Sequence, residues 1–311
     1  MTSRSLSLPV KPIHAKNPAL SYLDNLGSRG SATTMHNCLT HIAQILGRTD
    51  IFDTDWGALR RHHILFVMQK LKDKNIAPAT INLYFYSMKG VAKEAWSCDV
   101  MPQSAYLKIS ILKALNYVRL PVGRSLSKLQ CRKLLEACND ETLRGARDKA
   151  LLAIMIGCGL RRAEVVALKI ENWNSQEKTL CFIGKGNKQR KVFIPVSLLD
   201  NLQQWLEVRG LGEGAMFPRI TGHGKYESLK IQSHMLASSV YRIVRRRSRK
   251  ANIPDITPHD LRRTFATIML DAGVDLFVLQ QAMGHANLAI TARYDRRGEK
   301  AKAKAAKILK F

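Results

Sequence analysis

The stretch TLCFIGKGNKQRKVFIP, residues 179–195, contains the clearest strand pattern in the sequence. Two β-type runs, Thr179–Ile183 and Lys191–Pro195, flank a turn that carries glycine and basic residues. Short strands joined by such a turn are typical of a β-hairpin. The other periodic segments have the spacing of helices, so the predicted fold is mainly α with a small β-hairpin.

Apolar residues recur about every 3.6 positions on both sides of this hairpin, which predicts amphipathic helices. Up to residue 117 the predicted helices cover residues 32–46, 56–71 and 78–96. After residue 125 they cover residues 128–138, 142–158, 198–207, 233–251, 257–272 and 275–283. An all-helical domain is therefore followed by a mixed α/β domain that contains the hairpin.

Proline and glycine interrupt the helical pattern between these two domains, at Pro121 and Gly123. We take residues 118–125 as a linker between a helical domain of residues 17–117 and a mixed domain of residues 126–298. Residues 1–16 are then an N-terminal extension, and residues 299–311 are a basic C-terminal tail.

Positive charge dominates the composition. The 311 residues include 50 Lys and Arg against 24 Asp and Glu, a formal net charge of +26. Such an excess implies a polyanionic partner. No lipidation motif or membrane-binding amphipathic helix stands out, so nucleic acid is a better candidate than an anionic lipid surface. A merely basic surface is the alternative.

Simple patterns exclude several classes of protein. The longest nearly uninterrupted apolar stretch, residues 150–156, is far shorter than the roughly 20 residues that span a bilayer. Residues 1–16 lack the apolar block of a secretory signal, so we expect a cytoplasmic location, associated with the nucleoid if the partner is DNA. The six cysteines form no Cys-x-x-Cys pair, which argues against a zinc ribbon and a disulfide scaffold.

The segment GCGLRRAEV, residues 157–165, ends one helix at a glycine turn and begins another. Arg161 lies at the start of the second helix, where backbone N–H groups disfavour a cation unless an anion accompanies it. Glu164, three residues later, is placed to orient Arg161. The alternative is an ordinary surface ion pair between the two.

The turn of the hairpin presents Lys185, Lys188, Arg190 and Lys191. A basic finger of this kind can reach into a DNA groove, so the last three are candidate DNA-binding residues. Nearby arginines disfavour an ammonium group and lower its pKa, which would let Lys185 act as a general acid. The alternative is a solvated basic turn.

The segment TPHDLRR, residues 257–263, begins a helix with Thr257 as its cap and Pro258 at the first helical position. The i, i+3 spacing places His259 and Arg262 on one face. Both could bind one phosphate there, together with the N–H groups of the helix start. The alternative is a capped surface helix.

Gly284 and His285 end the last predicted helix, and Tyr294 follows nine residues later within TARYDRR, residues 291–297. A tyrosine among so many charges does not suit a purely apolar core. Its phenol is a poor nucleophile at neutral pH unless nearby cations stabilise the phenolate. Because a single tyrosine is far more often structural than catalytic, Tyr294 is a candidate only together with the other motifs.

These four motifs, in this order, resemble the catalytic signature of the tyrosine recombinase, or phage integrase, family. The signature residues are Arg161, Glu164, Lys185, His259, Arg262, His285 and Tyr294. Residues 125–297 resemble the family's catalytic domain, and residues 17–117 resemble its helical core-binding domain, as in short two-domain members of the Xer or mobile-element type. Two positions depart from the usual pattern: Arg263, where many relatives carry histidine, and Met283, where leucine is frequent.

The resemblance implies covalent chemistry on DNA. Tyr294 would attack a scissile phosphate and form a 3′-phosphotyrosyl bond. Arg161, oriented by Glu164, and Arg262 would bind the non-bridging oxygens and neutralise the charge that grows in the transition state. No metal ion or other cofactor is then expected.

Three further residues would serve in proton transfer and phosphate binding. Lys185 would protonate the leaving 5′-oxygen, His259 would assist proton transfer at the tyrosine, and His285 would hydrogen-bond the phosphate. A metal site at His259 and His285 is the weaker interpretation, because no cysteine or carboxylate pattern with zinc spacing accompanies them.

Basic residues outside the motifs are further DNA-binding candidates. Arg245, Arg246 and Arg247 lie near the end of the predicted helix 233–251, where they would bind phosphates or simply complement the helix dipole. Lys89 and Lys93 lie off the apolar stripe of the helix 78–96 and could meet phosphates. A plain amphipathic helix is the alternative there.

The resemblance also implies a double-stranded DNA recombination site as partner. On it a homotetramer would exchange strands through a Holliday junction, with or without a second recombinase or accessory protein. Integration or excision of a mobile element and dimer resolution all use this chemistry. Two alternatives stay open: relaxation of DNA by a type IB topoisomerase-like enzyme, and a noncatalytic DNA-binding regulator.

Overall fold

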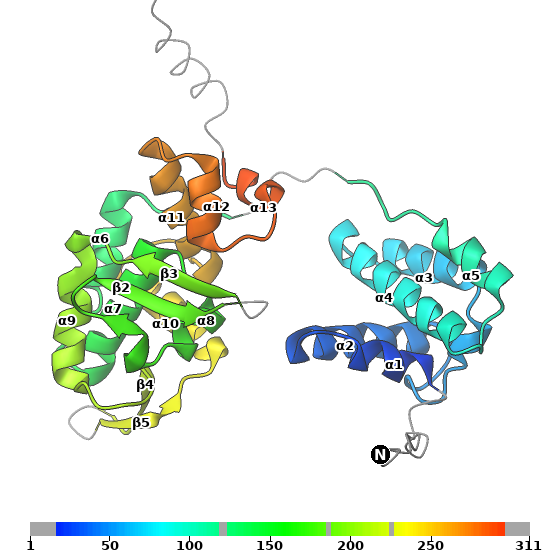
Figure 1. Ribbon diagram of the computed structural model, residues 1–311, viewed down its shortest axis with the longest axis horizontal. Coiled ribbons are helices and arrows are strands. Elements are labelled where there is room, and N and C mark those ends of the chain that lie inside the picture. The colour runs from blue at the N-terminus through cyan, green and yellow to red at the C-terminus, as the bar shows by residue number, and fades with distance from the viewer. Residues whose placement is uncertain (1–16, 118–122, 185–187, 224–226, 296–311) are drawn as a thin grey trace, which may run out of the picture. The chain divides into compact units, whose positions relative to one another are not determined.

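The computed structural model describes residues 17–117, 123–184, 188–223 and 227–295 (Figure 1). The chain divides into two compact units, residues 1–119 and 120–311, each with an apolar core of its own. The described residues are mainly helical and include two small antiparallel sheets, which confirms the predicted fold class. None of the described helices combines the length and the apolar character that crossing a membrane requires.

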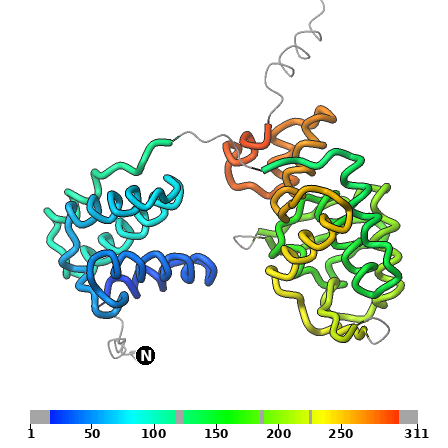
Figure 2. Tube along the Cα trace, turned by 180° about the vertical axis from the view of Figure 1, so that it is seen from behind, coloured from blue at the N-terminus to red at the C-terminus, as the bar shows by residue number. Residues whose placement is uncertain are grey.

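The first unit is helical throughout its described part. Its elements are α1 (Pro18–Asp24), α2 (Arg29–Ile45), the 3₁₀ turn η2 (Trp56–Ala58), α3 (Arg61–Asp73), α4 (Pro78–Ser97) and α5 (Gln103–Ser110). Within the described part of this unit, helix α4 packs against α1, α2, α3 and α5, as the reader can follow in Figures 1 and 2. Because Ile81, Phe85 and Met88 recur every three or four residues, one face of α4 is buried in the middle of the unit.

The helix predicted over residues 56–71 is two elements instead. The turn η2 ends at Ala58, and α3 begins only after an extended Leu59 and Arg60. The Arg60 guanidinium donates hydrogen bonds to the carbonyl oxygens of Gly57 (2.7 Å) and Leu59 (2.9 Å). These side-chain hydrogen bonds compete with the backbone hydrogen bonds of a helix, so the helix is interrupted at Leu59 and Arg60.

Lys89 makes hydrogen bonds within the protein, in place of the phosphate contact that the sequence predicted. Its ammonium group donates to the carbonyl oxygens of Ser110 (2.7 Å) and Leu112 (3.2 Å), at and just beyond the end of α5. A cation is favourable at the C-terminal end of a helix, where carbonyl groups lack helical partners. Lys89 therefore holds α5, whereas Lys93 is exposed and stays a DNA-binding candidate.

The second unit combines helices with the two sheets. Its elements are α6 (Lys128–Glu136), α7 (Leu143–Cys158), α8 (Arg162–Ala167), the 3₁₀ turn η3 (Ile170–Asn172), β1 (Trp173–Asn174), β2 (Thr179–Ile183), β3 (Gln189–Phe193), α9 (Val196–Arg209), β4 (Pro218–Thr221), β5 (Ser228–His234), α10 (Ala237–Lys250), α11 (Pro258–Asp271), α12 (Leu276–Met283) and α13 (Leu288–Ala292). Its order of elements places the predicted hairpin between two groups of helices.

The structure contains the hairpin that the sequence predicted. Strands β2 and β3 pair antiparallel from Thr179 opposite Phe193 to Ile183 opposite Gln189. The short strand β1 adds a third strand on the other edge of β2. Leu180 and Val192 face the core from neighbouring strands, so the hairpin is fixed by one apolar face.

The second sheet, β4 with β5, was not predicted. Its strands pair antiparallel, but β5 is mostly exposed and its sequence, SLKIQSH, carries few apolar residues. The helix predicted over residues 233–251 was wrong at its start, because His234 pairs with Pro218 and hydrogen-bonds the carbonyl of Val166 at 2.7 Å. Helix α10 begins only at Ala237.

Helix α7 forms the centre of the second unit. It is buried without interruption from Ala150 to Cys158 and packs against α9 and α11. It ends at Gly159, whose φ of +60° lies in the left-handed region that favours glycine. A Cβ at Gly159 would lie 2.4 Å from the ring of Phe265. The chain can therefore turn closely against α11 here, and this turn carries Arg161 to the start of α8.

Candidate active site

Arg161 precedes the first residue of α8, at the turn that follows α7. Its Nη1 atom lies 2.6 Å from Oε1 of Glu164, and its backbone N–H donates to Oε2 of the same carboxylate at 2.9 Å. Glu164 thereby binds both the backbone and the guanidinium of Arg161, which supports the orienting role predicted for it. The Arg161 side chain is 30% exposed, so it remains accessible to an anion.

Arg190 is buried and does not lie on the surface where DNA contact was predicted for it. Its Nη1 atom lies 2.8 Å from Oε2 of Glu164, and its guanidinium lies 5.2 Å from the ring centroid of Phe182. Burial raises the pKa of Glu164, but the hydrogen bond from the Arg161 backbone and the charge of Arg190 outweigh it and lower that pKa overall. Glu164 is thus an ionised carboxylate between two arginines.

Arg262 projects from the first turns of α11 and is 3% exposed. Its Nη1 atom donates to the carbonyl oxygen of Gly159 at the end of α7. Its Nη2 atom donates to the carbonyl oxygen of Met283 at 2.6 Å. Burial, followed by the charge of Arg161, lowers the pKa of Arg262 to about 10, so it is still a cation at neutral pH.

The end of α12 binds three arginines through three consecutive carbonyl groups. Ala282 accepts from Arg190 at 2.5 Å, Met283 from Arg262 at 2.6 Å, and Gly284 from Arg161 at 3.3 Å. Carbonyl groups at a helix C-terminus carry partial negative charge and lack helical partners. They therefore offset the mutual repulsion of the arginines and gather these positive charges in one place. These three residues, Arg161, Arg190 and Arg262, are called the arginine cluster.

His285 lies between Arg262 and α13. Its Nε2 atom is 2.8 Å from Nη2 of Arg262, and its Nδ1 atom is 2.9 Å from Oγ1 of Thr291. A guanidinium only donates hydrogen bonds, so Nε2 must accept here and Nδ1 carries the proton. Burial, and then the charges of Arg262 and Arg161, lower the pKa of His285 to about 4, which keeps the ring neutral at neutral pH.

Tyr294, just after α13, is 8% exposed and lies among these groups. Its ring stacks on His285 with centroids 5.7 Å apart and an interplanar angle of 16°. Its hydroxyl oxygen lies 3.4 Å from Nε2 of His259. The residue is therefore held by its ring, with its hydroxyl next to an imidazole that can take a proton.

His259, on the first turn of α11, is exposed at one side and faces Tyr294 at the other. Loss of solvent around the ring, followed by the charges of Arg263 and Arg262, lowers its pKa. Neutral imidazole is the form that accepts a proton, so this environment favours His259 as a general base.

The hairpin turn is only partly described. Lys185, the predicted general acid, lies outside the described residues. Lys188, directly before β3, is exposed. Lys191 is exposed as well and pairs with Glu177 at 2.6 Å. Lys188 and Lys191 thus stay surface candidates for DNA contact.

The arginines of α10 divide between the surface and the core. Arg247 is 3% exposed and pairs with Asp140 at 2.5 Å and with Asp148 at 2.9 Å, so it does not occupy the phosphate-binding surface predicted for it. Arg246 reaches Asp148 at 2.7 Å, but its side chain is 54% exposed. Arg245 pairs with Asp255 at 2.5 Å and is partly exposed.

The exposed arginines of α10 line a groove, here called the α10 groove. Its volume is about 460 Å³, and its lining residues are Tyr241, Arg242, Arg245, Arg246 and Arg249. Tyr241 also lines a cavity of about 290 Å³ at the catalytic candidates, whose other lining residues are Arg161, Arg162, Thr257, Pro258, His259 and Arg262. The two hollows are thus neighbours, and both are rich in arginine.

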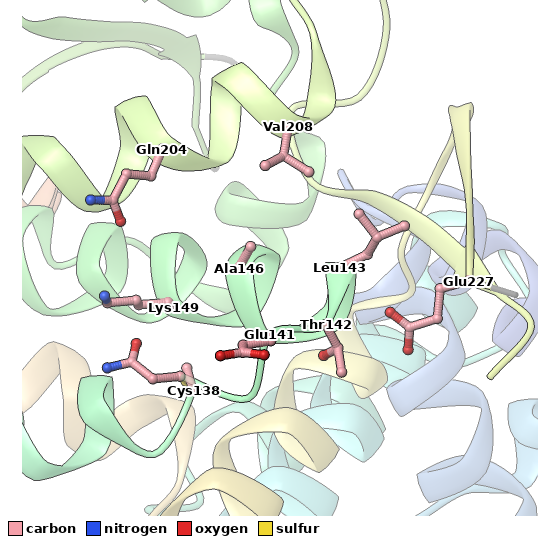
Figure 3. Close-up of a pocket in the computed structure, with 10 residues that line it drawn as sticks. Cys138, Glu141, Thr142, Leu143, Ala146, Lys149, Gln204, Val208 and Glu227 are labelled. Atoms are coloured by element: carbon pink, nitrogen blue, oxygen red, sulfur yellow. The ribbon is translucent and has the colours of Figure 1, made fainter. Parts of the chain in front are cut away.

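A cavity of about 790 Å³ lies away from these residues, between the turn that precedes α7, α7 itself and α9 (Figure 3). Glu141, Thr142, Lys149 and Gln204 are among its lining residues, and none of the catalytic candidates is. Within the described part of the chain, no three His, Cys, Asp or Glu side chains come together in a way that could hold a metal ion.

Two site residues escaped the reasoning from sequence. Oγ1 of Thr291 lies 2.9 Å from Nδ1 of His285 and can accept the proton there, and Arg263 places its guanidinium 5.8 Å from the ring centroid of Tyr294. Thr291 had no signal beyond its closeness to Tyr294 in the sequence. Arg263 had one, because it stands where many relatives carry histidine, but that departure by itself does not indicate a contact with the tyrosine.

The chain is similar to known proteins over most of its length. The model of the phage integrase family matches residues 124–300. The tyrosine recombinase XerA of Pyrococcus furiosus is 31% identical over 237 residues, which cover 74% of this chain and 73% of that protein. The tyrosine recombinase XerC of Proteus mirabilis is 29% identical over 303 residues, which cover 94% and 92%.

Solved structures show the same fold. The integrase of the transposon Tn1549, in complex with a circular intermediate DNA, matches with a TM-score of 0.68 and 16% identity over 94% of this chain and 100% of that one. A lambda integrase dimer bound to a core site matches with a TM-score of 0.66 and 14% identity over 90% and 96%. Since the family match covers more than half of the chain, the protein belongs to the phage integrase family and is a tyrosine recombinase, a site-specific enzyme that cleaves and rejoins DNA.

Proposed function

We propose that Tyr294 is the nucleophile of this recombinase. Its Oη atom attacks the scissile phosphorus and forms a 3′-phosphotyrosyl bond, while the bond from phosphorus to the 5′-oxygen breaks. The phenolic proton passes to Nε2 of His259, and Lys185 supplies a proton to the leaving 5′-oxygen. The observation that carries this assignment is the 3.4 Å approach of the Tyr294 hydroxyl to His259 beside the cluster of arginines.

Arg161 and Arg262 are the groups that we assign to the phosphate. Their guanidinium groups are fixed by carbonyl oxygens of the α7 and α12 ends, so little reorganisation is needed when charge develops on the non-bridging oxygens. The position of Glu164 supports its role in orienting Arg161.

His285 has a more specific role in this proposal than a direct phosphate contact. Its Nε2 lone pair already accepts from Arg262, and its low pKa keeps it neutral. It therefore orients the Arg262 guanidinium. Contact of Nε2 with a phosphate oxygen as a donor would require the proton to move from Nδ1 or a second proton to bind.

The α10 groove and the hairpin turn are the surfaces that we assign to the DNA backbone. Arg242, Arg246 and Arg249 are exposed along one side of α10, next to the catalytic cavity. Guanidinium groups at this spacing bind phosphates without reading the base sequence. Lys188 and Lys191 on the hairpin, and Lys93 on the first unit, are the further candidates.

The reaction as a whole is then strand exchange at a double-stranded recombination site. We assign to it a homotetramer on DNA and a Holliday junction intermediate, in the cytoplasm at the nucleoid, with integration or excision of a mobile element or dimer resolution as the task. The identified relatives are named recombinases, which favours this function over relaxation by a topoisomerase and over a noncatalytic regulator.

A recombination assay tests this function. Two plasmids of different size would each carry the DNA that flanks the gene, and wild-type enzyme would be added. The proposal expects joint molecules that contain both plasmids and that resolve into recombinants. Relaxed plasmids without any joint molecule would show a topoisomerase-like activity instead, and binding without either product would support the noncatalytic regulator.

A further inference from the structure

The segment that leads into the second unit is attached to α11 by side chains of that helix. Arg263 donates from Nη1 to the carbonyl oxygen of Gly123 at 2.9 Å, and the backbone N–H of Arg124 donates to Oδ1 of Asp260 at 3.1 Å. Oγ1 of Thr264 accepts a third hydrogen bond at 2.9 Å, from the backbone of residue 126. Residues 123–126 are thus fixed on the helix that carries His259 and Arg262.

Arg263 also contacts the ring of Tyr294. The residue is 8% exposed, and its Cζ atom lies 5.8 Å from the ring centroid, within the range of a cation–π interaction. Its buried Nε atom has no hydrogen-bond partner among the described residues. The hydrogen bond to Gly123 on one side and the Tyr294 ring on the other therefore define where this guanidinium lies.

The fit at Gly123 requires glycine. Its φ is +106°, and a Cβ there would lie 2.8 Å from Oδ1 of Asp260 and 3.0 Å from Cζ of Arg263. A side chain at residue 123 would therefore crowd both the Asp260 carboxylate and the Arg263 guanidinium.

We propose that Arg263 is a positioning residue for the nucleophile. The carbonyl group of Gly123 accepts a hydrogen bond from the Arg263 guanidinium and holds it in place. The guanidinium in turn contacts the Tyr294 ring, and His285 stacks on the same ring. The inference rests on the proposed role of Tyr294. It adds that residues next to the link between the two units determine how often the hydroxyl is aligned for attack.

The test compares Arg263→Met, which keeps an unbranched side chain of similar length and removes the charge, with wild type in single-turnover cleavage of a nicked DNA substrate. We expect the rate of covalent adduct formation to fall about tenfold, the effect of losing a desolvated cation–π contact. DNA affinity, measured by titration of the same duplex, should stay within about twofold, because a positioning residue of the nucleophile does not bind DNA.

A second substrate separates the nucleophile from the leaving group. When sulfur replaces the bridging 5′-oxygen, the leaving group needs no proton, so a defect in leaving-group protonation disappears. The Arg263→Met defect should persist on this substrate. Recovery of the wild-type rate would assign Arg263 to the leaving group and overturn the proposal.

Gly123→Ala perturbs the Arg263 guanidinium through its other contact, the one with residue 123. It should slow adduct formation in the same direction, and the loss in the double variant should be smaller than the two single losses combined, because both changes act on the Arg263 guanidinium. Gly210→Ala is the matched control: its φ is +78°, but a Cβ there meets no atom within 4 Å. Additive losses in the double variant, or an unchanged rate in Arg263→Met, would contradict the inference. A wild-type enzyme without an adduct would instead refute the proposed nucleophile.

Discussion

The hydroxyl oxygen of Tyr294 lies 3.4 Å from Nε2 of His259. A general base must come within hydrogen-bond reach of the proton that it removes, and catalytic hydrogen bonds are often long before substrate binds. The pair is therefore close to its working geometry.

The pH dependence of cleavage should report on His259. Because partial loss of solvent around the ring, and then the charges of Arg263 and Arg262, lower its pKa, the imidazole stays neutral at lower pH than an ordinary histidine. Single-turnover rates should hold through the usual histidine range and fall only on further acidification. His259→Gln should be slower by about 10²-fold and should lose this acid limb. An unchanged acid limb in the variant would assign the titration to another group.

Glu164 should stabilise the fold as well as the site. Replacing Glu164 by Gln leaves Arg190 buried without its carboxylate, which should cost about 3 kcal/mol of unfolding free energy at neutral pH. The pKa of Glu164 is lowered in the folded state, so its contribution is complete above the ordinary glutamate pKa and is lost as the pH falls through the lowered value. Denaturant unfolding of both proteins at several pH values should show the difference shrinking in acid. A constant difference would contradict the account.

Gly284 should be essential because the side chain of Arg190 lies directly beside it. Its φ is +61°, and a Cβ would lie 2.6 Å from Cδ and Nε of Arg190. Gly284→Ala should therefore abolish most cleavage and destabilise the protein. Gly273→Ala is the control, since its φ is +87° but a Cβ meets nothing within 4 Å. It should cost only about 1 kcal/mol for the backbone and retain cleavage. Equal activity of the two variants would show that the arginine contact is unimportant.

The α10 groove should contribute to DNA affinity without affecting the chemical step. Arg242→Gln and Arg249→Gln should each weaken binding and reduce the slope of log affinity against log salt by about 1, as expected for one lost phosphate contact. Cleavage at saturating DNA should be unchanged. Arg132, exposed on α6, supplies the matched control, and Arg132→Gln should leave the slope as it is. If Arg242→Gln and Arg249→Gln had the same salt slope as the control Arg132→Gln, the groove would be excluded as a DNA surface.

The local parts of the site could be predicted from the sequence. Arg161 with Glu164, and His259 with Arg262, are three residues apart, and helix geometry alone brings such pairs together. The hairpin followed from two β-type runs on either side of a turn that carries glycine and basic residues. Tyr294 became a candidate only through the resemblance to a family, because no local pattern distinguishes a reactive tyrosine.

The long-range contacts could not be predicted in this way. Arg190 meets Glu164 across 26 residues and the carbonyl of Ala282 across 92, and Arg247 meets Asp140 across 107. Each looked like a surface arginine in the sequence, because charge and periodicity do not say which carboxylate or helix end the fold will bring to it. Strand β5 is mostly exposed and carries few apolar residues, so the second sheet left no apolar pattern from which it could be predicted.

The most direct test of the account is covalent capture on Tyr294. Wild-type enzyme and Tyr294→Phe would be incubated with a nicked duplex that contains the recombination site, stopped with detergent and separated by size, and DNA binding of both would be measured in parallel. The account predicts a protein–DNA adduct with wild type, mapped to Tyr294, and none with the variant, at equal DNA affinity. An adduct of equal yield with Tyr294→Phe would contradict the central claim.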